Sequence, residues 1–153
     1  MAYRIERSTV QDKQEAVWHL LVQHRDELTT NKELMVLAPD WPRYKAMEDA
    51  GMLVTLFVYF NDEIVGYSCN IVGANLHYAG LRYAHNDVLY TAPEHRGRVG
   101  MRLIHETERV VAEEGAKLML WHAKPDTALD VILPRLGYRL QDKMYTKELA
   151  HGT

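Results

Sequence analysis

The chain has 153 residues, of which 47% are hydrophobic and 25% are charged, and its formal net charge is −3 with neutral histidines. A chain of this length can bury a real core, so we expect one domain over residues 1–153. The slightly acidic balance argues against a dedicated nucleic-acid binder, because such proteins usually carry a basic excess. Because Cys69 is the only cysteine, neither an intramolecular disulfide nor a cysteine metal cage can form.

The sequence also shows no sign of membrane insertion or secretion. No apolar run approaches the roughly 20 residues that are needed to cross a bilayer. The residues Met1–Arg7 alternate and are charged, unlike a signal peptide. We therefore expect a soluble cytoplasmic protein that binds no membrane, and we leave open whether it forms a homodimer.

The first half of the chain predicts a strand, two helices and a hairpin. Tyr3–Ser8 alternates like a strand, and apolar residues at helical spacing then continue to about Leu28. Asp40 stands where an N-cap precedes a second helix, and Gly51 ends that helix. A tight turn at Asn61-Asp62-Glu63 then joins two β-rich stretches, Met52–Phe60 and Ile64–Val72.

The second half alternates strands with helices. In chain order we expect a strand at Leu81–Thr91, a loop at Pro93–Gly100, an amphipathic helix at Met101–Glu114, a short strand at Lys117–Ala123, a helix at Pro125–Leu136 and one or two closing strands within Tyr138–Leu149. This order predicts an α/β fold with a mixed sheet, antiparallel in its early part and joined by crossovers in its late part.

A short stretch with two glycines, His95-Arg96-Gly97-Arg98-Val99-Gly100, lies between a predicted strand and a predicted helix. Glycines allow a ligand to approach the backbone closely, and a helix start presents unpaired N–H groups with a partial positive charge. Arg96, Arg98 and Arg102 add positive charge. We therefore expect an anion site suited to a pyrophosphate, with an ordinary strand–helix connection as the alternative. The glycine pattern fits neither a P-loop nor a dinucleotide fingerprint.

The segment Pro93–Ile104 resembles the acetyl-CoA signature of the GNAT N-acyltransferase superfamily, a Gln/Arg-x-x-Gly-x-Gly/Ala loop followed by an amphipathic helix. Three more segments are similar to the family's third strand, fourth helix and closing strand: Glu63–Tyr67, Arg135–Tyr138 and Tyr145–Leu149. The resemblance implies a GNAT-type fold with a mixed, mostly antiparallel sheet of about six to seven strands and about four helices. Around Asn86–Tyr90 the chain also resembles small GNAT-like proteins encoded by bacteriophages.

The resemblance also implies an activity, the transfer of an acetyl group from acetyl-CoA to a primary amine of a small molecule or a protein. The transfer is direct, within one ternary complex. The implied coenzyme A contacts are Leu89, Tyr90, Thr91, His95, Arg96, Gly97, Arg98, Val99, Gly100, Met101 and Arg102. The loop departs from a common family form, because no glycine separates Arg98 from Val99.

The strand before the loop carries the candidate catalytic residues. A strand has a period of two, so one face is expected to carry His85, Asp87, Leu89 and Thr91. In the GNAT family a carboxylate on this strand often acts as the base. The resemblance therefore implies Asp87 or His85 as the base, with a structural role for both residues as the alternative.

The family's usual general acid, a tyrosine in the fourth helix, is absent because the matching position is Leu133. Tyr138 and Tyr145 are replacements in principle, and core packing is the alternative role for Tyr138. The eight histidines show neither His-Glu-x-x-His nor His-x-His spacing, so we expect no metal site.

The acceptor pocket that the resemblance implies lies between the first two helices, their loop and a late hairpin. Carboxylates and aromatic rings in the corresponding segments suit a cationic amine: Glu27, Glu33, Asp40, Trp41, Tyr44, His77 and Tyr78. Two other functions stay open. One is a GNAT-fold binding or interaction protein with weak or no catalysis, such as a phage accessory protein. The other is a nucleic-acid binder, which the net acidity and the lack of aromatics among the arginines disfavour.

Overall fold

The computed structural model describes residues 2–150, and the chain divides into two compact units. The first unit runs to Trp121 and contains every strand of the sheet, and the second begins at His122 and contains helix α4 (Ala128–Arg135). The fold is α/β, with a mixed sheet of five strands and four α-helices. Whether the two units form one domain stays a prediction.

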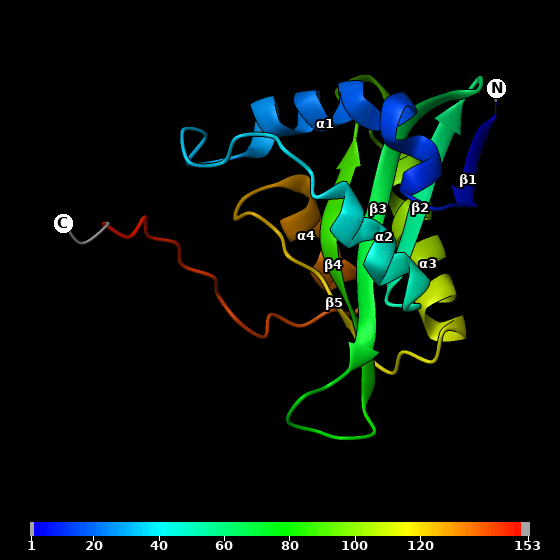
Figure 1. The fold of residues 1–153 in the computed structure, drawn as a ribbon. Helices are drawn as coiled ribbons and strands as arrows, with labels where there is room; N and C mark the ends of the chain where they lie inside the picture. Colours follow the sequence, from blue (N-terminus) through cyan, green and yellow to red (C-terminus); the bar gives the residue numbers. More distant parts are fainter. Residues whose placement is uncertain (1, 151–153) are drawn as a thin grey trace. The chain divides into compact units, whose positions relative to one another are not determined.

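The sheet is built in the order of the sequence (Figure 1). Its strands are β1 (Tyr3–Arg7), β2 (Leu53–Phe60), β3 (Glu63–Ala74), β4 (Arg82–Thr91) and β5 (Met119–Leu120). The first three pairs of neighbours are antiparallel, and β4 pairs with β5 in parallel. Most residues of β2 and β3 are buried, as expected for central strands covered on both faces.

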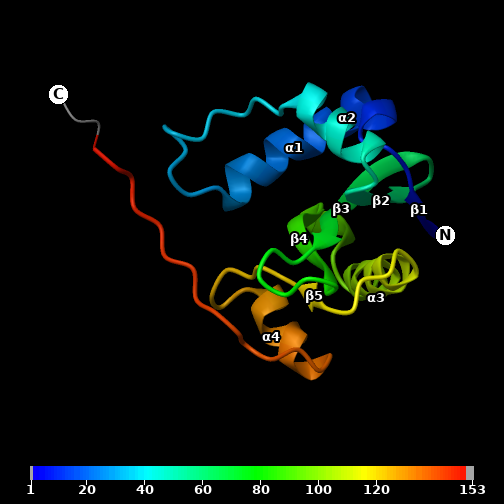
Figure 2. The ribbon, with the colours of Figure 1, turned by 60° about the horizontal axis from the view of Figure 1, so that its bottom comes forward.

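Helices cover both faces of this sheet (Figure 2). Helices α1 (Gln14–Leu28) and α2 (Trp41–Asp49) lie on one face, and α3 (Arg98–Glu113) lies on the other. Two single 3₁₀ turns, Gln11–Lys13 and Pro93–His95, precede α1 and α3. One core cluster, around Leu56, Val58 and Leu103, therefore lies on the α3 side. On the other face, one cluster around Leu20, Phe57 and Tyr67 lies under α1, and a smaller one around Leu53 and Cys69 lies under α2.

Local sequence signals explain where several elements begin and end. The Asp40 carboxylate accepts the Arg43 N–H at 3.1 Å and caps α2, as predicted. Asn61 and Asp62 have φ angles of 50° and 67°, which suit the two-residue turn of the predicted hairpin. Helix α3 begins at Arg98, three residues before the predicted start, because Gly97 is its N-cap. Among residues 2–150, no helix is long and apolar enough to span a membrane.

The predicted closing strands are the main error. Residues 138–150 contain no strand, so the sheet has five strands rather than six to seven. Strand β5 is also shorter than predicted, since it spans two residues of the expected Lys117–Ala123. In residues 138–150 the alternation of polar and apolar residues allows a strand but does not require one. A strand also needs a neighbouring edge that pairs with its backbone groups. Leu140 and Tyr145 are 78% and 87% exposed, so no face of the stretch is buried.

One glycine in the sheet has a clear steric reason. Gly66 of β3 lies opposite Thr91 at the end of β4. A Cβ atom on Gly66 would lie 2.9 Å from the Tyr90 carbonyl oxygen and 3.2 Å from the Thr91 Oγ1 atom. Two strands approach too closely here for a larger residue, and the sequence resemblance around Glu63–Tyr67 includes this glycine.

Replacing Gly66 with alanine should therefore destabilise the protein. We expect Gly66→Ala to lower the free energy of unfolding by about 1–3 kcal/mol, the usual cost of overpacking. Gly73→Ala in the same strand is the matched control, because its Cβ would meet only the Met52 Cε atom at 3.9 Å. Urea unfolding of both variants checks this, and equal stabilities would contradict the steric explanation.

Candidate functional site

Strand β4 contains a bulge at Asp87. Val88 pairs with Cys69 and Asn86 pairs with Asn70, so Asp87 is an extra residue that faces no partner in β3. Bulges of this kind bend a strand and re-aim its side chains, and they are frequent beside active sites. The exposed Asp87 side chain therefore lies at the point where β4 changes register.

The bulge overturns the expectation that His85, Asp87, Leu89 and Thr91 share one face. Ala84 and Leu89 are an odd number of positions apart, yet both pack in the core on the α3 side. His85 pairs with Ile71, which packs on the α2 side. His85 and Leu89 therefore point to opposite faces, because the extra residue reverses the alternation between them.

A buried polar network holds the bulge. The Asn86 Nδ2 group donates to the Val88 carbonyl and to the Asn70 Oδ1 atom, both at 3.0 Å. The Asn70 Nδ2 group and the Thr107 hydroxyl of α3 each donate to Ser68 Oγ at 3.0 Å. All four of these side chains are at most 2% exposed. Sequence reasoning missed this network, although asparagines within apolar strands are a signal for one.

The outer edge of β4 is paired only at its beginning. Ala84 pairs with Met119 and His85 pairs with Leu120, and within residues 2–150 no strand pairs with this edge after His85. The end of β4 thus offers backbone groups to an extended ligand, as a strand edge does to an added strand.

The N-terminus of α3 forms a second feature, seven residues after the end of β4. Gly97 is the N-cap with φ of 129°, a conformation that L-residues rarely adopt. The amide groups of Arg98 and Val99 come before the first intrahelical acceptor, and the Gly100 N–H already bonds to the Gly97 carbonyl at 3.1 Å. This helix end suits an anion.

Two arginines of this helix end are open to solvent. Arg98 and Arg102 are exposed and are four residues apart, so they lie on one face of α3. Among the described residues, neither guanidinium forms a hydrogen bond or a salt bridge. Both side chains therefore project into solvent, and their role as phosphate ligands stays a prediction.

Arg96 differs from these two arginines, because its side chain binds α1. Its guanidinium contacts both carboxylate oxygens of Glu27 at 2.7 and 2.8 Å, and its Nε atom donates to the Thr91 carbonyl at 2.9 Å. The Tyr90 hydroxyl donates to the same carboxylate at 2.7 Å, and His24 stacks on the Tyr90 ring with centroids 4.6 Å apart.

The charges of this cluster shift its titration. The hydrogen bond from Arg96 lowers the pKa of Glu27, and burial together with Glu27 raises the pKa of Tyr90. Glu27, which was expected in the acceptor pocket, is instead the anchor of the loop that precedes α3.

Other residues of the predicted coenzyme A site also use their side chains within the protein. His95 Nδ1 lies 3.0 Å from the Tyr3 hydroxyl, and the His95 ring lies 5.0 Å from Phe60. Val99 and Leu89 pack in the core on the α3 side. Such residues offer a ligand their backbone groups rather than their side chains.

Two of the candidate catalytic residues, His85 and Asp87, lie on β4 of the first unit. Burial raises the pKa of Tyr44 and of Cys69 to about 12, and the nearby Asp87 carboxylate adds to both shifts. Asp87 of β4 is thus close to both residues. Tyr138 belongs to the second unit, so its role stays a prediction. Within residues 2–150, no three His, Cys, Asp or Glu side chains are grouped so that they could hold a metal ion.

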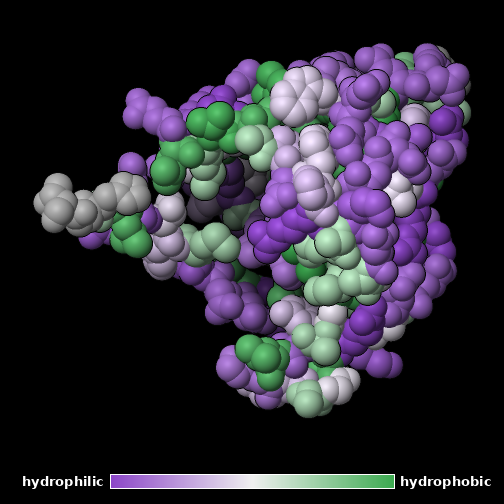
Figure 3. Space-filling model, in the orientation of Figure 1, coloured by the Kyte–Doolittle hydropathy of each residue, from purple (hydrophilic) through white to green (hydrophobic). Residues whose placement is uncertain are grey.

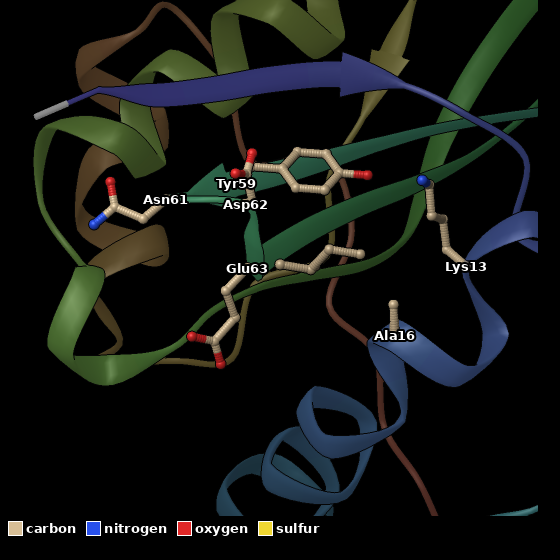
Figure 4. A pocket seen from close by; sticks show the side chains of 7 residues that line it. Lys13, Ala16, Tyr59, Asn61, Asp62 and Glu63 are labelled. Atoms are coloured by element: carbon tan, nitrogen blue, oxygen red, sulfur yellow. The ribbon is translucent and has the colours of Figure 1, made fainter.

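Two hollows of the first unit are relevant to the predicted site. A narrow cavity of about 40 Å³ lies between α1, α2 and the sheet, and Trp41 and Tyr44 from the predicted acceptor pocket line it. A wider hollow of about 370 Å³ lies beside the β2–β3 turn and is lined by Lys13, Tyr59 and Glu63 among others (Figure 4). No predicted site residue lines the wider hollow. Two other predicted acceptor residues line neither hollow: Asp40 caps α2, and Tyr78 is exposed in the β3–β4 connection. This connection projects at the bottom of Figure 3.

Comparison with known proteins identifies relatives of the chain. Residues 16–138 match the Acetyltransferase (GNAT) family, while no curated protein sequence matches the chain.

An aminoglycoside acetyltransferase from an uncultured soil metagenomic sample is similar with a TM-score of 0.78 at 15% identity, over 98% of this chain and 100% of that chain. The ribosomal-protein-alanine N-acetyltransferase from Brucella melitensis biovar Abortus 2308 has a TM-score of 0.71 at 17% identity, over 97% and 100%. The glucosamine-6-phosphate N-acetyltransferase from Arabidopsis thaliana has a TM-score of 0.74 at 12% identity, over 98% and 100%. At such identities the solved structures establish a likeness of fold.

The ion pair between Glu27 and Arg96 predicts a pH-dependent stability. Because the folded-state pKa of Glu27 is lowered, its contribution is complete at neutral pH and is lost as the pH falls through that pKa. We expect Glu27→Gln to reduce the free energy of unfolding by about 1 kcal/mol or less at pH 7, since both side chains are partly exposed. Urea unfolding at pH 7 and at acid pH should show the variant and the wild type converging in acid. Glu33→Gln in an exposed loop is the control, and a difference that persists unchanged in acid would contradict a role for the charge.

Proposed function

Because the chain belongs to the Acetyltransferase (GNAT) family, we propose that it is an N-acetyltransferase that transfers the acetyl group of acetyl-CoA to a primary amine. Members of this family use acetyl-CoA as co-substrate. The observation that carries the proposal is the position of two ligand-binding features on consecutive elements. The outer edge of β4 loses its strand partner after His85, and the N-terminus of α3 begins a few residues later with two exposed arginines.

These features suit two parts of coenzyme A. The amides of Arg98 and Val99, with the side chains of Arg98 and Arg102, suit the negatively charged phosphates. The edge of β4 from Leu89 to Thr91 suits the amide-containing pantetheine arm, which bonds as an added strand would. We propose contacts from Leu89, Tyr90, Thr91, His95, Arg96, Gly97, Arg98, Val99, Gly100, Met101 and Arg102, with His95 and Arg96 acting through their backbone.

The proposed reaction needs a proton acceptor, and the candidate residues for this role lie on β4. When bound, acetyl-CoA supplies a thioester whose C–S bond breaks as the new C–N bond forms, and the sulfur leaves with a proton. The amine must lose protons in this reaction, and we propose that Asp87 accepts one, directly or through water, since it is exposed at the bulge. His85 is the second candidate base, and Tyr138 is the candidate donor to sulfur. The three structural relatives named above carry names with different amine acceptors, which supports an amine without identifying it.

The proposed phosphate site predicts that acetyl-CoA binding depends on two arginines. We expect acetyl-CoA to raise the melting temperature of the wild type, because a ligand that binds the native state stabilises it. Arg98→Ala and Arg102→Ala should each raise the Kd for acetyl-CoA about tenfold, as the loss of a charge-assisted contact does. Arg109→Ala is the control, since Arg109 lies on the same helix but pairs with Glu106 and Glu113. Calorimetric titration measures all four proteins, and no binding to the wild type at millimolar acetyl-CoA would overturn the proposal.

The proposed role of Asp87 predicts a loss of rate without a loss of binding. We expect Asp87→Asn to lower kcat by about 100-fold or more, the range typical of general bases, while the Kd for acetyl-CoA stays within about twofold. The control is Asp62→Asn in the exposed β2–β3 turn, where Asn tolerates the φ angle of 67°. Release of the coenzyme A thiol measures the rate. An unchanged rate in Asp87→Asn would remove Asp87 from the mechanism.

A further inference from the structure

The narrow cavity between α1, α2 and the sheet is apolar. Its wall includes Trp41 and Tyr44 from α2, Phe57, Tyr67 and Cys69 from the two central strands, and Val88 from β4. Phe57, Tyr67 and Cys69 are at most 3% exposed, whereas Trp41, Tyr44 and Val88 are half-buried. The deep part of the cavity is therefore closed, and its mouth is formed by the half-buried side chains of α2 and β4.

The polar groups in the deep part of this wall are paired within the protein, and the Tyr44 hydroxyl belongs to a half-buried residue at the mouth. The Thr55 hydroxyl donates to the Cys69 Sγ atom at 3.5 Å, and His24 Nδ1 lies 2.6 Å from the Tyr67 hydroxyl. A polyhydroxylated ligand would find few partners here and would lose its hydrogen bonds to water. A hydrocarbon group loses nothing by entering such a site.

Negative charge lies beside this apolar wall. Asp87 is exposed and directly precedes Val88, which lines the cavity. Glu48 of α2 is the second carboxylate, and its charge, like that of Asp87, acts on Cys69. One Glu48 oxygen accepts the Val10 N–H at 2.6 Å, and the other is buried without a hydrogen-bond partner among residues 2–150.

An apolar cavity with carboxylates beside it matches a molecule that has a hydrocarbon body and an ammonium group. We propose that the acceptor is a primary amine on a compact apolar body, an alkylamine or arylalkylamine, whose body enters this cavity while its nitrogen faces Asp87. This inference rests on the proposed acetyltransferase function and deepens it. Trp41 and Tyr44, with ring centroids 5.7 Å apart, then contact the part of the body that remains at the mouth.

The size of the cavity sharpens the substrate class. A volume of about 40 Å³ is far below the roughly 300–1,000 Å³ of pockets that enclose drug-sized ligands. The cavity therefore admits a short chain or one edge of a ring, and an aminoglycoside does not fit it. The acceptors named for the structural relatives, an aminoglycoside and a phosphorylated amino sugar, are thus predicted to be poor substrates.

An amine panel tests this inference on the unmodified protein. Isoamylamine and phenethylamine represent the proposed class, and sisomicin and glucosamine 6-phosphate represent polar acceptors. We expect kcat/KM for the apolar amines to exceed that for the polar amines at least tenfold, with release of the coenzyme A thiol as the measurement. Equal or reversed preference would overturn the substrate class while leaving the acetyltransferase function intact. Failure of acetyl-CoA to bind in a titration without amine would instead overturn the proposed function itself.

A pair of tryptophan variants locates the binding site. We expect Trp41→Ala to raise KM for phenethylamine about tenfold, with the Kd for acetyl-CoA unchanged, because Trp41 lines the cavity. Trp18→Ala is the matched control, since Trp18 is 43% exposed on α1 and lines neither hollow. Equal KM values in the two variants would overturn the location. If Trp41→Ala does not fold, Tyr44→Leu tests the same wall with an apolar replacement.

Discussion

The hydrogen bond from the Asn86 side chain across the bulge is the constraint on which the site depends. Its amide group bonds to the Val88 carbonyl two residues ahead, so Asp87 is held as the extra residue. If Asp87 paired with Cys69 in a regular strand, Val88 and Tyr90 would point to the other face and the wall of the narrow cavity would lose Val88. The same bulge lies two residues after His85, the last residue that pairs with β5. One buried amide thus helps to orient the candidate base, complete a wall of the cavity and fix the part of β4 whose outer edge is unpaired.

The arginines of the loop divide into two groups with different partners. Arg96 binds Glu27 on α1 and the backbone of β4, so it fixes the loop to the body of the first unit. Arg98 and Arg102 project from the first turns of α3 into solvent. A loop shortened by one glycine therefore still ends in a helix start with two available cations. Helix α3 starts at Arg98, directly after Gly97, whose φ angle only glycine adopts easily.

The sequence predicted much of this arrangement, because many signals were local. Asp40 capped α2, Asn61 and Asp62 formed the turn, and the strand–loop–helix order around Gly97 was correct. The errors concern contacts between distant residues. The bulge depends on Asn70 and Ser68, which are far from Asn86 in the sequence, and the role of Glu27 depends on Arg96. The predicted closing strands are absent from residues 138–150 for a similar reason. The alternation of polar and apolar residues does not show whether a sheet edge is available to pair with them. Nothing in the structure bears on a bacteriophage origin.

The burial of Cys69 has a consequence for covalent chemistry. Burial raises the pKa of the Cys69 thiol to about 12, so the thiol stays protonated at neutral pH. The chain has no other cysteine, so it holds no second thiol on which an acyl-cysteine intermediate could form, in keeping with the direct transfer that we propose. Because the Cys69 thiol is buried, we expect that the folded protein does not react with the disulfide reagents that detect free coenzyme A. The absorbance in such an assay would then measure released coenzyme A alone.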